Sequence, residues 1–264
     1  MMMLETTDRN PAEIYDEKFV PALFAPWGAI VAELAGIGPG EKVLDVACGT
    51  GALTAVVAEK VGPEGRVTGL DINPQMLAVA RAKPLAVEWI EAPAERLPFA
   101  DAAFDAVLSQ FGFMFFDDQA LALGEMHRVL RPGGRLAVAV CGAVEDSPGY
   151  AVFASLLDDL FGEDVGNAFR APFVLGDAEK LAAICEKAGL AGARIVSRTG
   201  SVRFDSIAEL VSTERACVWT LGGVLDEGQF ELLRRESERA LRPFTDADGR
   251  IAFAMPSLII AATK

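Results

Sequence analysis

The amino-acid sequence predicts an α/β fold with a doubly wound parallel sheet at its centre. Apolar runs typical of strands alternate with helical stretches from about residue 40 to residue 142. The links between them are short and rich in glycine and proline. The strand-like runs are apolar nearly throughout, as strands are when helices cover both faces of a parallel sheet. Such alternation with short connections is typical of a doubly wound sheet.

Five strands are expected in this alternating part of the chain. Helices are expected after the first, second and fourth of them, at 53–61, from Pro74 onward and at 117–130. Proline is favoured in the first turn of a helix, and aspartates such as Asp117 and Asp118 stabilise a helix start. The strands are predicted at KVLDVA (42–47), RVTGLDI (66–72), AVEWIEA (86–92), FDAVLSQF (104–111) and RLAVAVCGA (135–143).

The last third of the chain has a different pattern. Two strand-like segments, 193–204 and 250–264, are separated by a mostly helical stretch, which indicates a hairpin added at the sheet edge. We therefore divide the chain into four expected parts. They are an N-terminal helical lid segment (1–38), the core (39–144), cap helices (145–192), and edge hairpin strands (193–264) with a helical insertion at 205–249.

Composition narrows the class of protein. The 264 residues carry 38 acidic against 24 basic side chains, a formal net charge of −14. A chain this acidic repels phosphate backbones, so we expect no nucleic-acid partner. The longest apolar run, 136–144, is far shorter than the ~20 residues of a spanning helix, so no membrane insertion is expected. The first ten residues have no apolar core of a signal peptide, so we expect a cytoplasmic protein.

No metal site is expected from the cysteines and histidine. The four cysteines are far apart in the sequence, and His127 is the only histidine. Zinc sites usually draw ligands from closely spaced Cys and His pairs, which are missing here. The cysteines are therefore interpreted as small buried apolar residues: Cys48, Cys141, Cys185 and Cys217.

The segment VLDVACGTG (43–51) carries the main chemical signal. Gly49 and Gly51 permit a sharp turn from a strand into a helix and let a ligand approach the main chain. Asp71 ends the next strand, twenty residues after Gly51. A carboxylate at that position can accept both ribose hydroxyls of a nucleoside cofactor.

Two details favour one nucleoside cofactor over another. A dinucleotide fingerprint would have Gly or Ala at the sixth position of the glycine motif, where this chain has Thr54. Asp45, before the loop, would repel a pyrophosphate but could meet an ammonium group. A ligand with a ribose, an adenine and an amino-acid tail suits such a site, and S-adenosylmethionine has these parts.

Taken together, the motifs resemble those of class I S-adenosylmethionine-dependent methyltransferases. The likeness is greatest to the methyltransferase type 11 group, which includes ubiquinone- and menaquinone-biosynthesis enzymes. It covers residues 15–142 and rests on VLDVACGTG (43–51), GLDINPQML (69–77), APAERLPFADAAFDAVLSQFGFMFF (92–116) and EMHRVLRPGG (125–134). This resemblance implies a Rossmann-like seven-stranded sheet of order 3-2-1-4-5-7-6 with strand 7 antiparallel, and a helical cap.

The resemblance also implies a cofactor site with S-adenosyl-L-homocysteine as the product. The glycine loop would cradle the methionine part and Asp71 would bind the ribose. One departure concerns the adenine, because Pro93 stands where the family often has Asp. The implied cofactor residues are Asp45, Ala47, Cys48, Gly49, Thr50, Gly51, Asp71, Ile72, Met76, Ala94, Glu95, Ser109, Gln110 and Phe111.

The acceptor is expected to be a small, largely apolar molecule such as a quinone precursor, phenol, polyketide or lipid-like acid. Methyl transfer to oxygen or carbon by in-line displacement needs mainly alignment and a dry site. His127 is a candidate general base, weighed against a structural role in its helix. The expected acceptor pocket consists of Tyr15, Phe24, Trp27, Phe113, Phe161 and Trp219.

Three alternatives remain open from the sequence. One is an NAD-dependent oxidoreductase, against which Thr54 and the lack of a recognisable hydride-transfer set count. Another is a protein that binds S-adenosylmethionine without turnover. The third concerns the cap, which could pair two copies of the chain in a homodimer instead of binding the acceptor.

Overall fold

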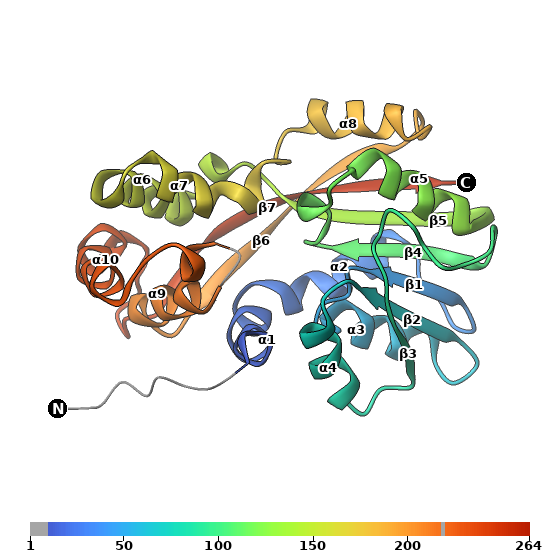
Figure 1. Cartoon of the computed structure of the whole chain (residues 1–264), viewed down its shortest axis with the longest axis horizontal. Helices are drawn as coiled ribbons and strands as arrows, with labels where there is room; N and C mark the ends of the chain where they lie inside the picture. The colour runs from blue at the N-terminus through green and yellow to red at the C-terminus, as the bar shows by residue number, and fades with distance from the viewer. Residues whose placement is uncertain (1–9, 218–219) are drawn as a thin grey trace.

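The centre of the molecule is a seven-stranded sheet with the order β3-β2-β1-β4-β5-β7-β6 (Figure 1). The computed structural model describes residues 10–217 and 220–264. Neighbouring strands among β1 to β5 are parallel, and β7 is antiparallel to β5 and β6. Both the order and the strand directions confirm the prediction. The strands are β1 (Lys42–Val46), β2 (Arg66–Asp71), β3 (Val87–Glu91), β4 (Phe104–Gln110), β5 (Leu130–Cys141), β6 (Arg194–Phe204) and β7 (Ile251–Thr263).

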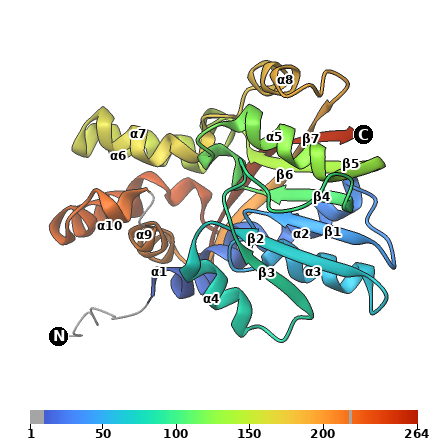
Figure 2. The ribbon, with the colours of Figure 1, turned by 45° about the vertical axis from the view of Figure 1, so that its right-hand side comes forward.

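Helices cover both faces of the parallel strands (Figure 2). α2 (Ala25–Leu34) packs on α3 (Ala52–Val61). α4 (Pro74–Ala82) lies on the same face as α3, because both helices belong to right-handed crossovers that run in the same direction across the sheet, from β1 to β2 and from β2 to β3. α5 (Gln119–Val129) and α8 (Ala178–Lys187) contact each other on the opposite face. This arrangement explains why the inner strands are apolar nearly throughout.

The N-terminal segment bridges the sheet and the outer helices. α1 (Pro11–Ile14) continues into a π-helical segment, η1 (Tyr15–Phe24), which contacts α2, α9 and β6. Pro21 lies inside η1 and has no N–H group to donate, so the regular α-helical hydrogen-bond ladder cannot continue through it. Such wide turns are frequent at functional sites.

The β6–β7 hairpin is longer than the rest of the sheet. β7 pairs with β5 only over residues Ser257–Thr263, whereas residues 251–256 pair with β6 beyond the end of β5. This extension, here called the hairpin arm, carries the remaining helices away from the parallel strands (Figure 1). They are α6 (Pro148–Phe161), α7 (Glu163–Arg170), α9 (Ile207–Ala216) and α10 (Glu227–Ala240).

The cap differs from the expected segment 145–192 in one respect. α6 packs on α7, α10 and β7, whereas α8 packs on α5 and β6 and therefore lies on the sheet. The two fully buried side chains of α8, Leu181 and Cys185, form a single stripe that covers the sheet edge. We propose that the cap consists of α6, α7, α9 and α10, without α8.

Short helical turns complete the described chain, and none of its helices has the length and apolar character required to cross a bilayer. The turns are η2 (Phe113–Phe115), η3 (Val144–Asp146), η4 (Ala171–Phe173), η5 (Leu221–Gly223) and η6 (Arg242–Phe244).

The packing of Trp89 over β2 generates a stability prediction. Trp89 lies opposite Gly69 in the β2–β3 register, and a Cβ atom on Gly69 would lie 2.4 Å from the indole ring. We expect Gly69→Ala to lower the free energy of unfolding by about 1–3 kcal/mol, since overpacking forces side chains or backbone to shift. Urea denaturation measures this change.

Gly124→Ala in α5 is the matched control, because a Cβ at Gly124 has no neighbour within 4 Å. Alanine is favoured over glycine in a helix by about 0.5–1 kcal/mol, so this variant is expected to be at least as stable as the parent protein. Equal stability of both variants would contradict the close packing of Trp89 on Gly69.

Candidate functional site

A cavity of about 580 Å³ lies at the carboxyl ends of the parallel strands, where open α/β sheets bind their ligands. Its floor is formed by the loops after β1, β2 and β4, and its roof by η1 together with the cap. We call it the main cavity. Twelve of the expected site residues line it: Tyr15, Phe24, Asp45, Ala47, Cys48, Gly49, Thr50, Asp71, Ile72, Met76, Gln110 and Phe111.

A smaller pocket of about 230 Å³ adjoins the main cavity and shares Ala47, Asp71 and Ile72 with it. Ala94 and Glu95 line this side pocket. Oε1 of Glu95 accepts the N–H of Asp117 at 3.0 Å, so the carboxylate ties the segment after β3 to the start of the loop before α5. Ala94 and Glu95, two of the expected cofactor residues, therefore lie next to the loop of Asp71.

The carboxylate of Asp71 joins the two loops that meet at the cavity floor. Its Oδ2 accepts the N–H of Gly49 at 2.8 Å, and its Oδ1 accepts the N–H of Asn73 at 2.8 Å. Burial raises the pKa of Asp71, and these backbone hydrogen bonds act in the opposite direction. Each carboxylate oxygen has a further lone pair, so a ligand hydroxyl can still donate to it.

Gly49 leaves open space beside this tie. Its φ is +54°, a left-handed conformation that favours glycine, and a Cβ there would have no neighbour within 4 Å. The backbone of the loop is therefore accessible from the main cavity, as close approach of a ligand to the main chain requires.

Asp45 is buried below the same loop, with 1% of its surface exposed. Its Oδ2 accepts a hydrogen bond from the Thr54 hydroxyl at 2.5 Å, whereas its Oδ1 has no hydrogen-bond partner. Burial raises the pKa of Asp45 to about 7. Thr54 thus has a specific role, because it holds one oxygen of Asp45 and leaves the other without a partner.

Gln110 and Phe111 connect the floor to the roof. Nε2 of Gln110 donates to the carbonyl of Phe24 in η1 at 3.1 Å, and its buried Oε1 has no partner. The rings of Phe24 and Phe111 are 5.4 Å apart. Phe111 has a φ of 56° and Ala47 one of 55°, so two non-glycine residues at adjoining strand ends hold left-handed conformations. Such conformations cluster at functional sites.

Several expected site residues lie outside both cavities. Ser109 precedes Gln110 in β4, and successive side chains of a strand point to opposite faces, so Ser109 does not line the main cavity. Gly51 lies against Trp89, whose ring would be 2.8 Å from an added Cβ. Trp27, Phe113 and Phe161 also do not line the main cavity.

The three aromatic residues have packing roles. Trp27 is fully buried, with its ring 5.5 Å from that of Phe111, and Phe113 is fully buried against Phe116. Phe161 is half-buried at the end of α6, where it packs on the hydrophobic core. The sixth expected residue of the acceptor pocket, Trp219, lies outside the described residues.

His127 does not line the main cavity. It lies on α5, and its backbone carbonyl accepts from the Lys264 side chain at 2.8 Å. Burial and the charge of Lys264 lower the pKa of His127. The structure therefore places this ring on a helix that covers the sheet face, away from the cavity lining, and its role as a general base stays a prediction.

The structure adds cap residues that the sequence pattern did not single out. Glu214 and Tyr150 both line the main cavity, with 4% and 1% of their surfaces exposed. A signal for Glu214 existed, because it follows the buried Leu210 and Val211 of α9 by four and three residues and so shares their helix face. Tyr150 had no such signal, because aromatic residues in an apolar helix are usual in cores.

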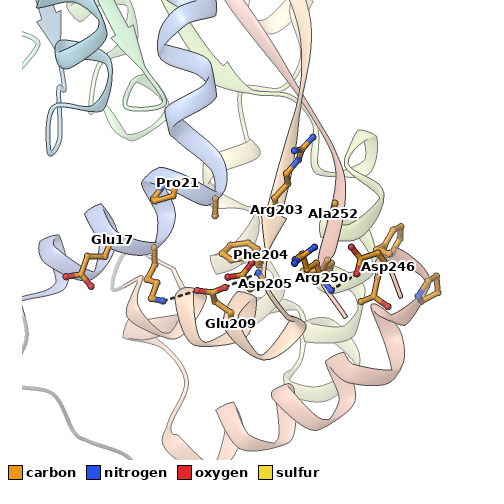
Figure 3. A pocket seen from close by; sticks show the side chains of 15 residues that line it. Glu17, Pro21, Arg203, Phe204, Asp205, Glu209, Asp246, Arg250 and Ala252 are labelled. Atoms are coloured by element: carbon orange, nitrogen blue, oxygen red, sulfur yellow. Dashed lines mark hydrogen bonds and ion pairs between the residues drawn. The ribbon is translucent and has the colours of Figure 1, made fainter. Parts of the chain in front are cut away.

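A third hollow, the outer groove, lies on the far side of η1 between η1 and the hairpin arm, with a volume of about 820 Å³ (Figure 3). Two of its carboxylates have partners within it. Lys18 forms an ion pair with Glu209 at 2.9 Å, and Oδ1 of Asp246 accepts the backbone N–H of Arg250 at 2.9 Å. The glycine loop and Asp71 are not among its lining residues, so it is separate from the site at the strand ends.

Among the described residues, no group of three or more His, Cys, Asp or Glu side chains is arranged so that it could hold a metal ion. The functional site is therefore defined by the glycine loop, the two aspartates and the apolar cavity.

Comparisons with known proteins agree with this geometry. Residues 44–138 match the family model of a methyltransferase domain. The chain is 35% identical over 192 residues to a ubiquinone/menaquinone biosynthesis C-methyltransferase of Teredinibacter turnerae, covering 67% of this chain and 77% of that protein. It is 34% identical over 194 residues to a demethylmenaquinone methyltransferase of Staphylococcus aureus, covering 67% and 78%.

Among solved structures, a phosphoethanolamine N-methyltransferase of Haemonchus contortus in complex with S-adenosylhomocysteine is similar in fold. The TM-score is 0.60 at 17% identity, with 96% of this chain and 56% of that chain covered. The oxidoreductase alternative and the alternative without turnover have no support in these relatives. The chain belongs to the class I S-adenosylmethionine-dependent methyltransferases, and S-adenosylmethionine is its cofactor.

Proposed function

We propose that this enzyme methylates a ring carbon of a small hydroxylated aromatic acceptor of the quinone-precursor class. The observation that carries the proposal is the main cavity, where an apolar, largely aromatic chamber is continuous with the cofactor loops. The relatives named above, which carry the names of ubiquinone and menaquinone biosynthesis, support the choice of acceptor class. A cavity of this size is typical of sites for small molecules.

The cofactor residues are assigned by the fit of their chemistry to the parts of the cofactor. Asp71 would bind the ribose hydroxyls, and the exposed backbone at Gly49 would contact the methionine part. The unpartnered Oδ1 of Asp45 suits the ammonium group. The adenine would occupy the side pocket between Ile72 and Ala94, with recognition left to main chain and Glu95 because Pro93 has no carboxylate.

When bound, S-adenosylmethionine supplies a methyl group on a positively charged sulfur. The residues of the chain then need to align the acceptor and keep water out. Tyr15 and Phe24 of η1 close the roof over the floor at Phe111, and the tie from Gln110 to the Phe24 carbonyl holds this roof in place. Proximity and orientation in a dry site are therefore the main contribution of the protein.

The acceptor assignment is tested with methyl-labelled S-adenosylmethionine and demethylmenaquinol. We expect label in a new carbon–methyl bond, identified by NMR of the product. Gly49→Val is the inactive control, since its side chain would fill the open space beside the loop and its φ of +54° disfavours a β-branched residue. Label on oxygen or nitrogen, or transfer only to acceptors without a hydroxylated ring, would contradict the proposal.

The ribose assignment makes Asp71→Asn a sensitive variant. The change replaces an acceptor oxygen by an amide donor, and hydrogen bonds to charged groups are worth about 1.5–3 kcal/mol each. We expect S-adenosylhomocysteine to bind at least tenfold more weakly, as measured by isothermal titration calorimetry. Glu91→Gln, at the exposed end of β3 opposite Asp71, is the matched control and should bind as the parent does. Unchanged affinity in folded Asp71→Asn would refute the assignment.

The raised pKa of Asp45 predicts a pH dependence of cofactor binding. Below its pKa of about 7 the free protein holds this carboxyl neutral, whereas pairing with an ammonium requires the ionised form. Affinity for S-adenosylhomocysteine should therefore fall as pH decreases below 7, by up to about tenfold per pH unit, and level off above 7. Calorimetry between pH 5 and 8 measures this profile.

Asp45→Asn provides the comparison for this profile, because an amide of similar shape cannot ionise. It should bind more weakly at pH 8 and with little dependence on pH. A parent profile that is flat from pH 5 to 8 would show that Asp45 does not pair with the ammonium group.

A further inference from the structure

A carboxyl group without a partner lies in the apolar part of the main cavity. Glu214 of α9 is 4% exposed and lines this cavity, and no hydrogen bond or ion pair of its side chain exists among the described residues. Burial alone raises the pKa of Glu214 to about 8. Carboxylates are seldom buried without a partner, because removing the charged form from water costs free energy. Packing alone therefore does not explain a carboxyl group at this position.

A hydroxyl without a partner lies in the same part of the cavity. Tyr150 of α6 is 1% exposed, and its buried OH has no hydrogen-bond partner. Glu214 and Tyr150 line the same cavity, and burial, followed by the charge of Glu214, raises the pKa of Tyr150. Rings of the cap and arm hold Tyr150 in place, since those of Phe169 and Phe253 are 5.4 and 5.0 Å away.

The surroundings of this pair decide which ligand group it suits. No lysine, arginine or histidine is among the described residues that line the cavity, so Glu214 has no cation there. The other titratable groups lining this end are Tyr15, Cys141 and Cys217. A ligand hydroxyl can donate to a carboxylate and accept from a tyrosine OH at the same time, whereas an ammonium group has no lone pair to accept with.

We propose that Glu214 is the general base that takes the proton of the acceptor's ring hydroxyl, and that Tyr150 donates a hydrogen bond to the oxygen that becomes negative. This inference rests on the proposed function, because it requires a hydroxylated ring in the main cavity. It assigns the acceptor's polar end to the cap, between α6 and α9, and its reacting carbon to the end near Gln110 and the glycine loop.

Proton transfer to Glu214 precedes methyl transfer to the ring carbon. The O–H bond of the acceptor breaks, and the proton goes to a carboxylate oxygen of Glu214. The electron pair left on the acceptor is delocalised into the ring, and a ring carbon forms a bond to the methyl carbon. The carbon–sulfur bond breaks with its electrons staying on sulfur. The ring carbon then loses its proton to water, and Glu214 returns its proton to the product's oxygen, which restores the hydroxyl group.

The proton transfer can be observed without turnover by using 4-nitrophenol, whose anion has a visible absorption band that the neutral phenol lacks. The protein is saturated with S-adenosylhomocysteine and kept in excess over the probe at pH 8, where part of Glu214 is ionised and can take a proton. We expect the bound probe to show the phenolate band in the parent protein. In Glu214→Gln the bound probe should show the neutral band, and its affinity should fall at least tenfold.

Matched probes and variants separate this role from packing. Nitrobenzene has the same ring without the hydroxyl, so its affinity should change less than threefold in Glu214→Gln. Tyr150→Phe should weaken binding of 4-nitrophenol and shift its ionisation toward the neutral form, again with nitrobenzene little affected. Glu209→Gln lies on the same helix but pairs with Lys18, and it should leave both probes unchanged.

Folding of the main variant is checked by urea denaturation. Glu214→Gln removes a buried carboxyl that has no partner, so at pH 8 it should be at least as stable as the parent protein. If Glu214→Gln is less stable there, or if the parent fails to bind 4-nitrophenol or binds it only as the neutral phenol, the general-base role is refuted. Equal phenolate bands in the parent and in Glu214→Gln would refute it as well.

A methyl-transfer assay with demethylmenaquinol distinguishes this inference from the proposed function. Glu214→Gln should reduce kcat by about 10²–10⁴-fold, the usual contribution of general acid–base catalysis, while S-adenosylhomocysteine affinity changes less than threefold. Full activity in Glu214→Gln would overturn the inference and leave the proposed function standing. No transfer in the parent protein would overturn the proposed function, and the 4-nitrophenol spectra would still decide the role of Glu214.

Discussion

The hydrogen bond from the Gly49 N–H to the Asp71 carboxylate is the interaction on which the site depends. It joins the loop after β1 to the loop after β2 at 2.8 Å, and the second oxygen of Asp71 holds the start of α4 through Asn73. Because β1 and β2 are parallel neighbours, their carboxyl ends meet at one edge, so a single side chain can fix both loops. The same carboxylate lines the main cavity, so the group that holds the two loops together is also the one proposed to bind the ribose.

The roof depends on contacts from distant parts of the chain. η1 comes from the N-terminus and contacts α9 and β6, while the hairpin arm extends past β5 and carries α9 and α10. One wall of the main cavity is therefore made of the parallel core, and the other of elements that precede and follow this core in the chain. Under the proposed function, this division would let the acceptor end change in sequence without disturbing the cofactor end, since the two share few backbone elements.

Buried acids define the electrostatics of the cavity. Asp45, Asp71 and Glu214 all line it, burial raises the pKa of each, and no basic residue accompanies them among the described lining residues. Such an interior favours a ligand that brings positive charge, as the ammonium and sulfur of S-adenosylmethionine do. Desolvation of these carboxylates lowers the stability of the folded protein. Such a cost is typical of functional sites, where side chains are placed to bind a ligand.

The sequence by itself determined the parallel core, the glycine loop and the acid at the end of β2, because these signals lie within single short segments and have fixed spacing. Tertiary structure decided which side chains reach the cavity. Gln110 lines it and Ser109 does not, because successive side chains of a strand point to opposite faces, and Trp27 is fully buried in the core. Glu214 and Tyr150 line one cavity only because α9 and α6 are both carried by the hairpin arm, and no local pattern in the sequence encodes this placement of two helices that are distant in the chain.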